Sequence, residues 1–166
     1  MTTTSRMRTP LYTAAERQRR DRSVWTRVQA WLAPLQFLVF AVSLCLVLRY
    51  LYDGRGLGVA TASVLLKTAV LYLIMVTGSF WERDVFGKYL FAGAFFWEDV
   101  VSMLVIALHT AYVVALLCDL LGPRQRMLLA LAAYASYVIN AAQFLIKFRM
   151  ARLAAVVPVA LAGARK

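Results

Sequence analysis

Acidic and metal-binding residues are scarce in this chain. Its 166 residues include 8 Asp and Glu against 19 Lys and Arg, and His109 is the single histidine, so one chain cannot supply a haem with two histidine ligands. The two cysteines, Cys45 and Cys118, lie in separate apolar segments without a CxxC pattern, and indicate neither a disulfide framework nor a zinc site. The first 30 residues hold no apolar run typical of a cleavable signal peptide, so we expect the first apolar segment to act as the insertion signal.

Hydrophobic residues, in contrast, make up 62% of the chain, more than the core of a soluble protein of this size can bury. Charged residues are confined to short segments between four apolar stretches of about 20 residues, the length that crosses about 30 Å of hydrocarbon. We therefore predict an all-α, polytopic membrane protein, a four-transmembrane-helix bundle. The predicted spans are residues 31–52, 57–80, 97–121 and 127–148, within a transmembrane domain of residues 31–150.

Two terminal segments flank this domain. Residues 1–30 form a basic cytoplasmic segment in which 13–29 either is a helix on the membrane surface or belongs to a disordered tail. Residues 151–166 form a short apolar and basic tail that is too brief to span, and we expect it to lie on the membrane or to be loose. Pro34 is expected in the first turn of the first span, where a missing N–H costs little. Gly122-Pro123 should end the helix of the third span before the last span begins.

The basic residues indicate the orientation. Of the 19 Lys and Arg residues, 14 lie before the first span, between the second and third, or after the fourth, and four lie at the opposite ends of the spans. The positive-inside rule then places both termini in the cytoplasm. Because the arginines flank apolar segments, the net charge of +11 indicates contact with the lipid bilayer and its anionic headgroups, and no binding of nucleic acid is expected.

Polar residues recur inside the spans at helical spacing. Three spans each carry one such stripe. The stripe of the second span is Ser63, Lys67, Ile74 and Gly78, that of the third is Glu98, Ser102, Val105, His109 and Tyr112, and that of the fourth is Ser136, Asn140, Gln143 and Lys147. Ionisable side chains facing lipid cost several kcal/mol, so these faces should meet in the bundle interior. At about 1.5 Å per residue, Lys67, His109 and Asn140 lie near the midplane, and Glu98, Asp99 and Gln143 nearer the cytoplasm.

Aromatic side chains, among them Phe96, Trp97 and Tyr134, could sandwich a flat apolar ligand beside this interior. Simpler readings exist for each feature. Trp97 could be an anchor at the membrane interface, and Asn140 and Gln143 could form hydrogen bonds between helices. Lys67 could form a structural ion pair with Glu98 or Asp99.

Four segments resemble the vinyl bacteriochlorophyllide hydratase family of bacteriochlorophyll biosynthesis. They are residues 11–29, 33–40, 67–117 and 129–153, and the most telling motifs are WEDV at 97–100 and ALHTAY at 107–112. The resemblance implies a hydro-lyase that adds water to the C3 vinyl group of a chlorophyllide or bacteriochlorophyllide, giving the 3-(1-hydroxyethyl) product in the inner or intracytoplasmic membrane. It implies a tetrapyrrole substrate and no cofactor, since the magnesium belongs to the substrate. Implied protein partners are other enzymes of this biosynthesis or a second copy of the chain.

The resemblance assigns no catalytic residue, so the candidates rest on chemistry. A general acid would protonate the terminal vinyl carbon and a base would orient the attacking water, roles for which Glu98 and Asp99 are candidates. His109 would be either the axial ligand of the substrate magnesium or a proton donor. Candidates for substrate binding are Lys67, Asn140, Gln143, Trp97, Phe96 and Tyr134, and the propionate could be held by Lys67, Lys147 or Arg83.

Two other functions fit parts of the pattern. A non-enzymatic membrane pigment-binding or assembly factor would need the aromatic residues and a magnesium ligand but no acid and base. A small transporter or proton-coupled channel would use Lys67, Glu98 and His109 as a relay, but the chain has no paired half-repeats.

Overall fold

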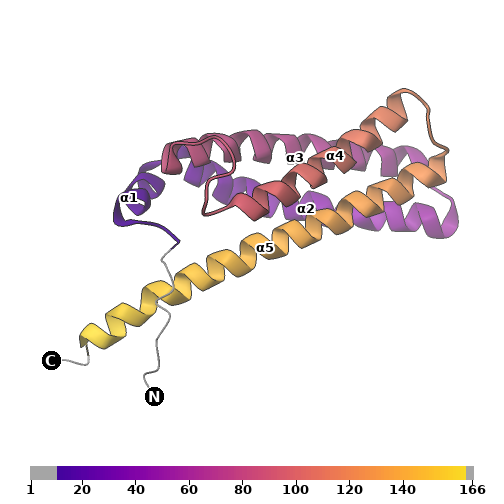
Figure 1. The fold of residues 1–166 in the computed structure, drawn as a ribbon. Coiled ribbons are helices and arrows are strands. Elements are labelled where there is room, and N and C mark those ends of the chain that lie inside the picture. Colours follow the sequence, from indigo (N-terminus) through magenta and orange to yellow (C-terminus); the bar gives the residue numbers. More distant parts are fainter. Residues whose placement is uncertain (1–10, 164–166) are drawn as a thin grey trace, which may run out of the picture.

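The computed structural model describes the backbone of residues 11–163 and the side chains of residues 11–151. This part of the chain contains helices and no strand: α1 (Ala14–Arg22), α2 (Val24–Asp53), α3 (Leu57–Phe86), α4 (Phe96–Leu117) and α5 (Pro123–Gly163) (Figure 1). Helices α2 to α5 are each long and apolar enough to cross a membrane. The predicted all-α, four-helix architecture is confirmed, and the chain is a multi-pass membrane protein.

The helix of the first span begins at Val24, well before the predicted residue 31. Its first turns carry polar side chains that find partners on α3: Trp81 Nε1 donates to Thr26 Oγ1 over 3.0 Å, and Gln29 Nε2 donates to Thr77 Oγ1 over 2.8 Å. These bonds let polar residues continue the helix. Pro34 therefore lies inside α2 rather than in its first turn as predicted.

The other helix ends follow local backbone chemistry. Helix α3 continues to Phe86, past the predicted residue 80, and ends at Gly87, whose φ of 78° suits glycine and whose N–H bonds to Arg83 O. Helix α4 ends at Leu117, and α5 starts with Pro123 in its first turn, so the predicted break at Gly122-Pro123 is present. Helix α5 continues to Gly163, so the tail is helical up to that residue. Residues 1–10 and 164–166 of the predicted terminal segments lie outside the described residues.

The bundle consists of two antiparallel pairs. Helix α2 packs mainly on α3 and α4 on α5, whereas the contact between α3 and α4 is much less extensive than that within either pair. The shared core is apolar and tightly closed, with Val47, Val64, Val105 and Met127 buried. Large apolar side chains cover the outside, among them Leu38, Leu66, Leu104 and Leu145, each more than half exposed. This outward apolar surface is what lipid contact requires.

Helix α1 packs across the end of the bundle where α3 ends and α4 begins. A capping box starts it, because Thr13 N–H donates to Glu16 Oε2 over 2.7 Å and Glu16 N–H donates to Thr13 Oγ1 over 3.3 Å. These bonds lower the pKa of Glu16. Just before the helix, Tyr12 is buried against the rings of Phe86 and Phe95, with centroids at 5.9 and 6.4 Å.

Burial raises the pKa of Tyr12 from its ordinary value of 10.0 to about 12. Since the unfolded or undocked phenol ionises first, the stabilisation from docking is fully present below pH 10 and is lost as the pH rises towards 12. The difference in phenolate absorbance between wild type and Tyr12→Phe reports the titration of Tyr12 alone. We expect this difference to rise with a midpoint near pH 12. A midpoint near 10 would show that Tyr12 is not buried at this position.

Candidate active site

The polar stripe on α4 faces the bundle interior as its spacing predicts. Its buried residues are Glu98, Asp99, Ser102, Val105, His109, Tyr112 and Ala115. The neighbouring aromatic residues have the opposite orientation: Phe96 is 45% and Trp97 is 68% exposed. The two rings therefore lie on the outer face of α4, away from the stripe, where a tryptophan at a helix end suits the membrane interface.

Two carboxyl groups from neighbouring helices meet at the start of this stripe. The carboxyl groups of Asp99 on α4 and Glu82 on α3 lie close enough to interact directly, and both residues are about 95% buried or more. A carboxylate has no proton to donate, so a bond between two carboxyls requires one of them to be protonated. Side by side in a buried site, the two groups can share one proton, as an acid and its conjugate base.

The connection between α3 and α4 fixes both carboxyls. Phe91 N–H donates to Asp99 Oδ2 over 2.7 Å, and Ala92 N–H donates to Glu82 Oε2 over 3.3 Å. Phe91 has a φ of 59°, a left-handed conformation that is uncommon for a bulky residue. The loop adopts this conformation where its two successive N–H groups reach the acid pair.

Glu82 is a buried residue of this candidate site that the sequence did not predict. The predicted second span ended at residue 80, which placed Glu82 in a connection. Because α3 continues to Phe86, Glu82 extends the face of Lys67 and Gly78 by helical spacing. The signal was present in this spacing and was cut off by the predicted helix end.

Glu98 has a different partner from Asp99. Lys147 on α5 forms a salt bridge with Glu98 Oε2 at 2.5 Å and also donates to the carbonyl oxygen of Ala94. The structural alternative in which Lys67 pairs with Glu98 or Asp99 is therefore absent. Arg83, a candidate for holding the propionate, donates instead to Tyr89 Oη.

An aromatic cluster closes this end of the bundle. Phe95 is fully buried and its ring lies 5.6 to 5.8 Å from those of Trp81, Phe86, Phe144 and Phe148. The cluster packs directly beside the Lys147–Glu98 pair, since Lys147 Nζ lies 5.0 Å from the centroid of Phe95. It shields the charged groups from the side of α1.

A second polar group lies deeper in the bundle, around His109. His109 Nδ1 lies 2.8 Å from the carbonyl oxygen of Val105, and since a carbonyl only accepts, Nδ1 carries the proton. In the neutral ring the lone pair is then on Nε2, which has no hydrogen-bond partner among residues 11–151. The ring lies beside that of Tyr134, with centroids 5.9 Å apart, so His109 offers a nitrogen ligand rather than a proton.

Serine and tyrosine hydroxyls join three helices behind His109. Ser43 on α2 bonds to Tyr134 on α5 over 2.6 Å and to Ser63 on α3 over 2.8 Å. Tyr134, predicted to contact substrate, thus has a structural partner. Nearer to the carboxyl pair, Asn140 donates to Ser102 over 2.8 Å, which is the interhelical bond expected of a buried amide.

Several buried polar atoms have no partner among the described residues. They are both amide atoms of Gln36, Lys67 Nζ, His109 Nε2, Tyr112 Oη, Asn140 Oδ1 and Gln143 Oε1. Such atoms are rare in folded proteins, because a buried polar group without a partner costs about 1–3 kcal/mol. These atoms belong to all four long helices, α2 to α5, and each is a position at which a polar ligand or water would supply the missing partner.

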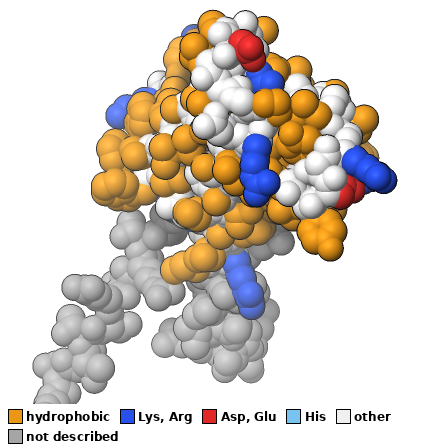
Figure 2. Space-filling view, turned by 90° about the vertical axis from the view of Figure 1, so that its right-hand side faces the viewer, with side chains coloured by type: hydrophobic (Ala, Val, Ile, Leu, Met, Phe, Trp, Pro, Cys, Tyr) orange, Lys and Arg blue, Asp and Glu red, His pale blue; other side chains and the backbone are white. Residues whose placement is uncertain are grey.

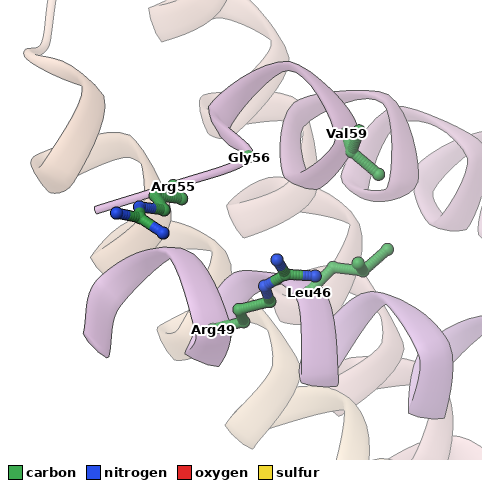
Figure 3. Close-up of a pocket in the computed structure, with 5 residues that line it drawn as sticks. All are labelled: Leu46, Arg49, Arg55, Gly56 and Val59. Atoms are coloured by element: carbon green, nitrogen blue, oxygen red, sulfur yellow. The ribbon is translucent and has the colours of Figure 1, made fainter. Parts of the chain in front are cut away.

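Surface hollows lie at the other end of the bundle. One of about 170 Å³ is lined by Leu46, Arg49, Arg55, Gly56 and Val59 (Figure 3). A second, of about 140 Å³, is lined by Tyr50, Leu51, Tyr52, Gly54 and Arg124. Neither lining contains a carboxyl group or a histidine, so neither offers acid–base chemistry. The chemistry-bearing residues are those between α3 and α4.

Comparison with known proteins adds an independent finding. The family model described as 2-vinyl bacteriochlorophyllide hydratase matches residues 12–150. A protein of that name from Rhodobacter capsulatus is 63% identical over 89% of this chain and 86% of its own length. The protein of the same name from Cereibacter sphaeroides is 65% identical over 86% of this chain and 89% of its own length. No solved structure matches.

The Lys147–Glu98 pair gives a test of the site's architecture. Lys147→Met leaves the buried carboxylate of Glu98 unpaired, and we expect it to lower the free energy of unfolding by about 1–3 kcal/mol. This loss is smaller than that for a fully buried ion pair, because Lys147 is partly exposed and solvent screens its charge. Adding Glu98→Gln should recover part of the loss. Unfolding in detergent measures the effect, with Lys88→Met on the exposed connection as the control. Strictly additive effects of the two single changes would contradict the pairing.

Proposed function

The chain belongs to the 2-vinyl bacteriochlorophyllide hydratase family, and from this premise we propose that Glu82 and Asp99 carry out the hydration. The enzyme is a hydro-lyase that adds water to the vinyl group of its tetrapyrrole in bacteriochlorophyll biosynthesis. The observation that carries the assignment of roles is the placement of two buried carboxyls side by side, each held by a backbone N–H of the same connection, where they can share one proton.

The proposed reaction has two steps. The protonated carboxyl gives its proton to the terminal vinyl carbon, which becomes a methyl group, and the macrocycle delocalises the cation left on the adjacent carbon. The other carboxylate takes a proton from water as the water oxygen bonds to that carbon. One proton leaves the pair and one returns, so the shared-proton state is restored with no redox change. This chemistry calls for no cofactor.

The substrate's magnesium has a proposed ligand in His109 Nε2. This nitrogen is buried, lacks a partner and carries the lone pair, because Nδ1 is committed to Val105 O. Imidazole is a suitable axial ligand for a metallated macrocycle. Of the two roles considered for His109, the tautomer supports the ligand role over proton donation.

The seam between α3 and α4 is the proposed position of the macrocycle. Glu82 lies on α3, Asp99 and His109 lie on α4, and the contact between these two helices is much less extensive than that within the α2–α3 and α4–α5 pairs. On the lipid side the seam is bridged by the hydrogen bond of 2.7 Å between Tyr72 and Thr110. A flat pigment dissolved in the bilayer would reach the acid pair by separating these helices, without crossing the aqueous phase.

We place both termini, and with them the acid pair, at the cytoplasmic face of the inner or intracytoplasmic membrane. Helix α1 and the connection from Gly87 to Phe95 lie at one end of the bundle, together with Arg83 and Lys88 (Figure 1). The opposite end shows hydrophobic side chains with scattered Lys, Arg, Asp and Glu side chains among them (Figure 2). The positive-inside rule supports this orientation.

Substitution of the two carboxyls tests the proposal. We expect Glu82→Gln and Asp99→Asn each to lower kcat by roughly 100-fold or more with little change in KM, because general acid–base catalysis contributes about 10²–10⁴. The assay follows the hydroxyethyl product formed in ¹⁸O-labelled water by membranes containing the chain. Glu98→Gln, the matched control, should retain most of its turnover. Near-normal turnover of both test variants would reject the pair.

The same assay separates an enzyme from a pigment carrier. A carrier would bind the vinyl pigment through His109 but would form no labelled product, and the carboxyl substitutions would leave binding unchanged. Product formation by this chain alone would exclude the carrier.

Removing the metal from the substrate tests His109. We expect His109→Ala to weaken binding of the magnesium pigment on the order of tenfold, because an axial bond is lost, and to leave binding of the magnesium-free pigment unchanged. Fluorescence titration in nanodiscs measures both affinities. Equal losses for the two pigments would show that His109 does not ligate the metal.

A further inference from the structure

Asn140 on α5 presents an unused hydrogen-bond acceptor to the bundle interior. Its Nδ2 donates to Ser102 Oγ on α4 over 2.8 Å, whereas its Oδ1 is buried and has no partner among residues 11–151. The residue is only 8% exposed, so bulk solvent does not satisfy this oxygen. A buried amide oxygen is costly to leave unpaired and accepts a bond from an N–H or O–H group. The structure therefore offers a position for a small donor at Asn140 Oδ1.

The bond to Ser102 places this acceptor beside the carboxyl pair. Ser102 follows Asp99 by three residues on α4, and side chains at this spacing are neighbours, with Cβ atoms about 5–6 Å apart. The offset between the two residues along the helix axis is about 4.5 Å. Asn140 thus approaches Asp99 from α5, whereas Glu82 approaches it from α3. A small donor bound to Asn140 Oδ1 lies within reach of the pair.

A second free acceptor continues this polar face towards the end of the bundle. Gln143 follows Asn140 by three residues on α5, and its Oε1 is also buried without a partner in the described part of the chain. Four residues further along the same face, the side chain of Lys147 is 27% exposed. Polar groups therefore lead from the partly exposed end of the bundle to Asn140. Water is the small donor available at that end.

Water has two O–H groups, and the proposed reaction uses them differently. One gives its proton to the carboxylate of the pair as the water oxygen bonds to the cationic carbon. The other stays intact and needs an acceptor that holds it while a lone pair faces this carbon. An amide oxygen suits the second O–H group, because it accepts a hydrogen bond without taking the proton.

We propose that Asn140 Oδ1 binds the water molecule that attacks the pigment and orients it together with the carboxylate of the Glu82–Asp99 pair. The inference rests on the proposed function and extends it to the second substrate. The pigment reaches the pair through the seam between α3 and α4, whereas the water reaches it along α5. Holding the water in place before reaction lowers the entropic part of the barrier.

Methanol as a competing nucleophile tests this role, because it has one O–H group where water has two. Methanol adds to the same carbon and gives the methyl ether, and its hydroxyl proton passes to the carboxylate. In wild type, methanol leaves Asn140 Oδ1 without a donor and should be disfavoured. Asn140→Leu keeps the number of side-chain heavy atoms but removes the acceptor. At a fixed methanol fraction, we expect it to raise the ratio of ether to hydroxyethyl product roughly tenfold.

Mass spectrometry of the products formed by membranes containing the full chain measures this ratio. The ratio does not depend on the amount of folded protein, so it separates positioning from structural support. Gln29→Leu is the matched control, because it also removes an amide that bonds between helices, to Thr77, and should leave the ratio unchanged. Asn140→Asp keeps an oxygen acceptor and should stay within about threefold of wild type.

The outcomes separate this inference from the proposed function. If wild type forms no hydroxyethyl product, the proposed function fails. If wild type forms the product but Asn140→Leu has an unchanged ratio, with or without ether, Asn140 has a structural role only and the inference is overturned. If Asn140→Leu forms neither product, Asn140→Val, a smaller apolar substitution, takes its place under the same criteria. Loss of both products in both variants also overturns the inference.

Discussion

The absence of hydrogen-bonding solvent in the bilayer is the constraint on which this structure depends. A polar group that faces hydrocarbon loses several kcal/mol, so each must turn inward and find a partner. Leucines accordingly cover the outside of the bundle, while Glu98, Asp99, Ser102 and His109 share the inner face of α4. Apolar burial alone would not select this arrangement, because lipid is as apolar as the core.

Inward polar groups then divide into those with partners and those without. The Ser43–Ser63–Tyr134 bonds and the Asn140–Ser102 bond join helices and fix their register. Lys67 and His109 Nε2 instead remain open in the same dry interior. A protein keeps such costly groups where a ligand or water completes them.

Helical spacing in the sequence was sufficient to predict the four helices and the buried face of α4. It did not predict which carboxyl has which partner, because the pairing of Asp99 with Glu82 and of Glu98 with Lys147 depends on how three helices pack. Glu82 was missed because hydropathy does not show where a helix extends beyond hydrocarbon. Phe96 and Trp97 are adjacent to the stripe in sequence but face outward, since successive residues of a helix point about 100° apart.

The position of the acid pair at a helix boundary has its own physical reason. Within a membrane helix every N–H is used by a carbonyl one turn away, so free backbone donors exist only where the helix stops. The connection between α3 and α4 supplies two, at Phe91 and Ala92, and each donates to one carboxyl. The same boundary lies closest to water, which is the second substrate. A pair built at the midplane would have neither the donors nor the water, whereas the pigment, soluble in the bilayer, reaches either depth.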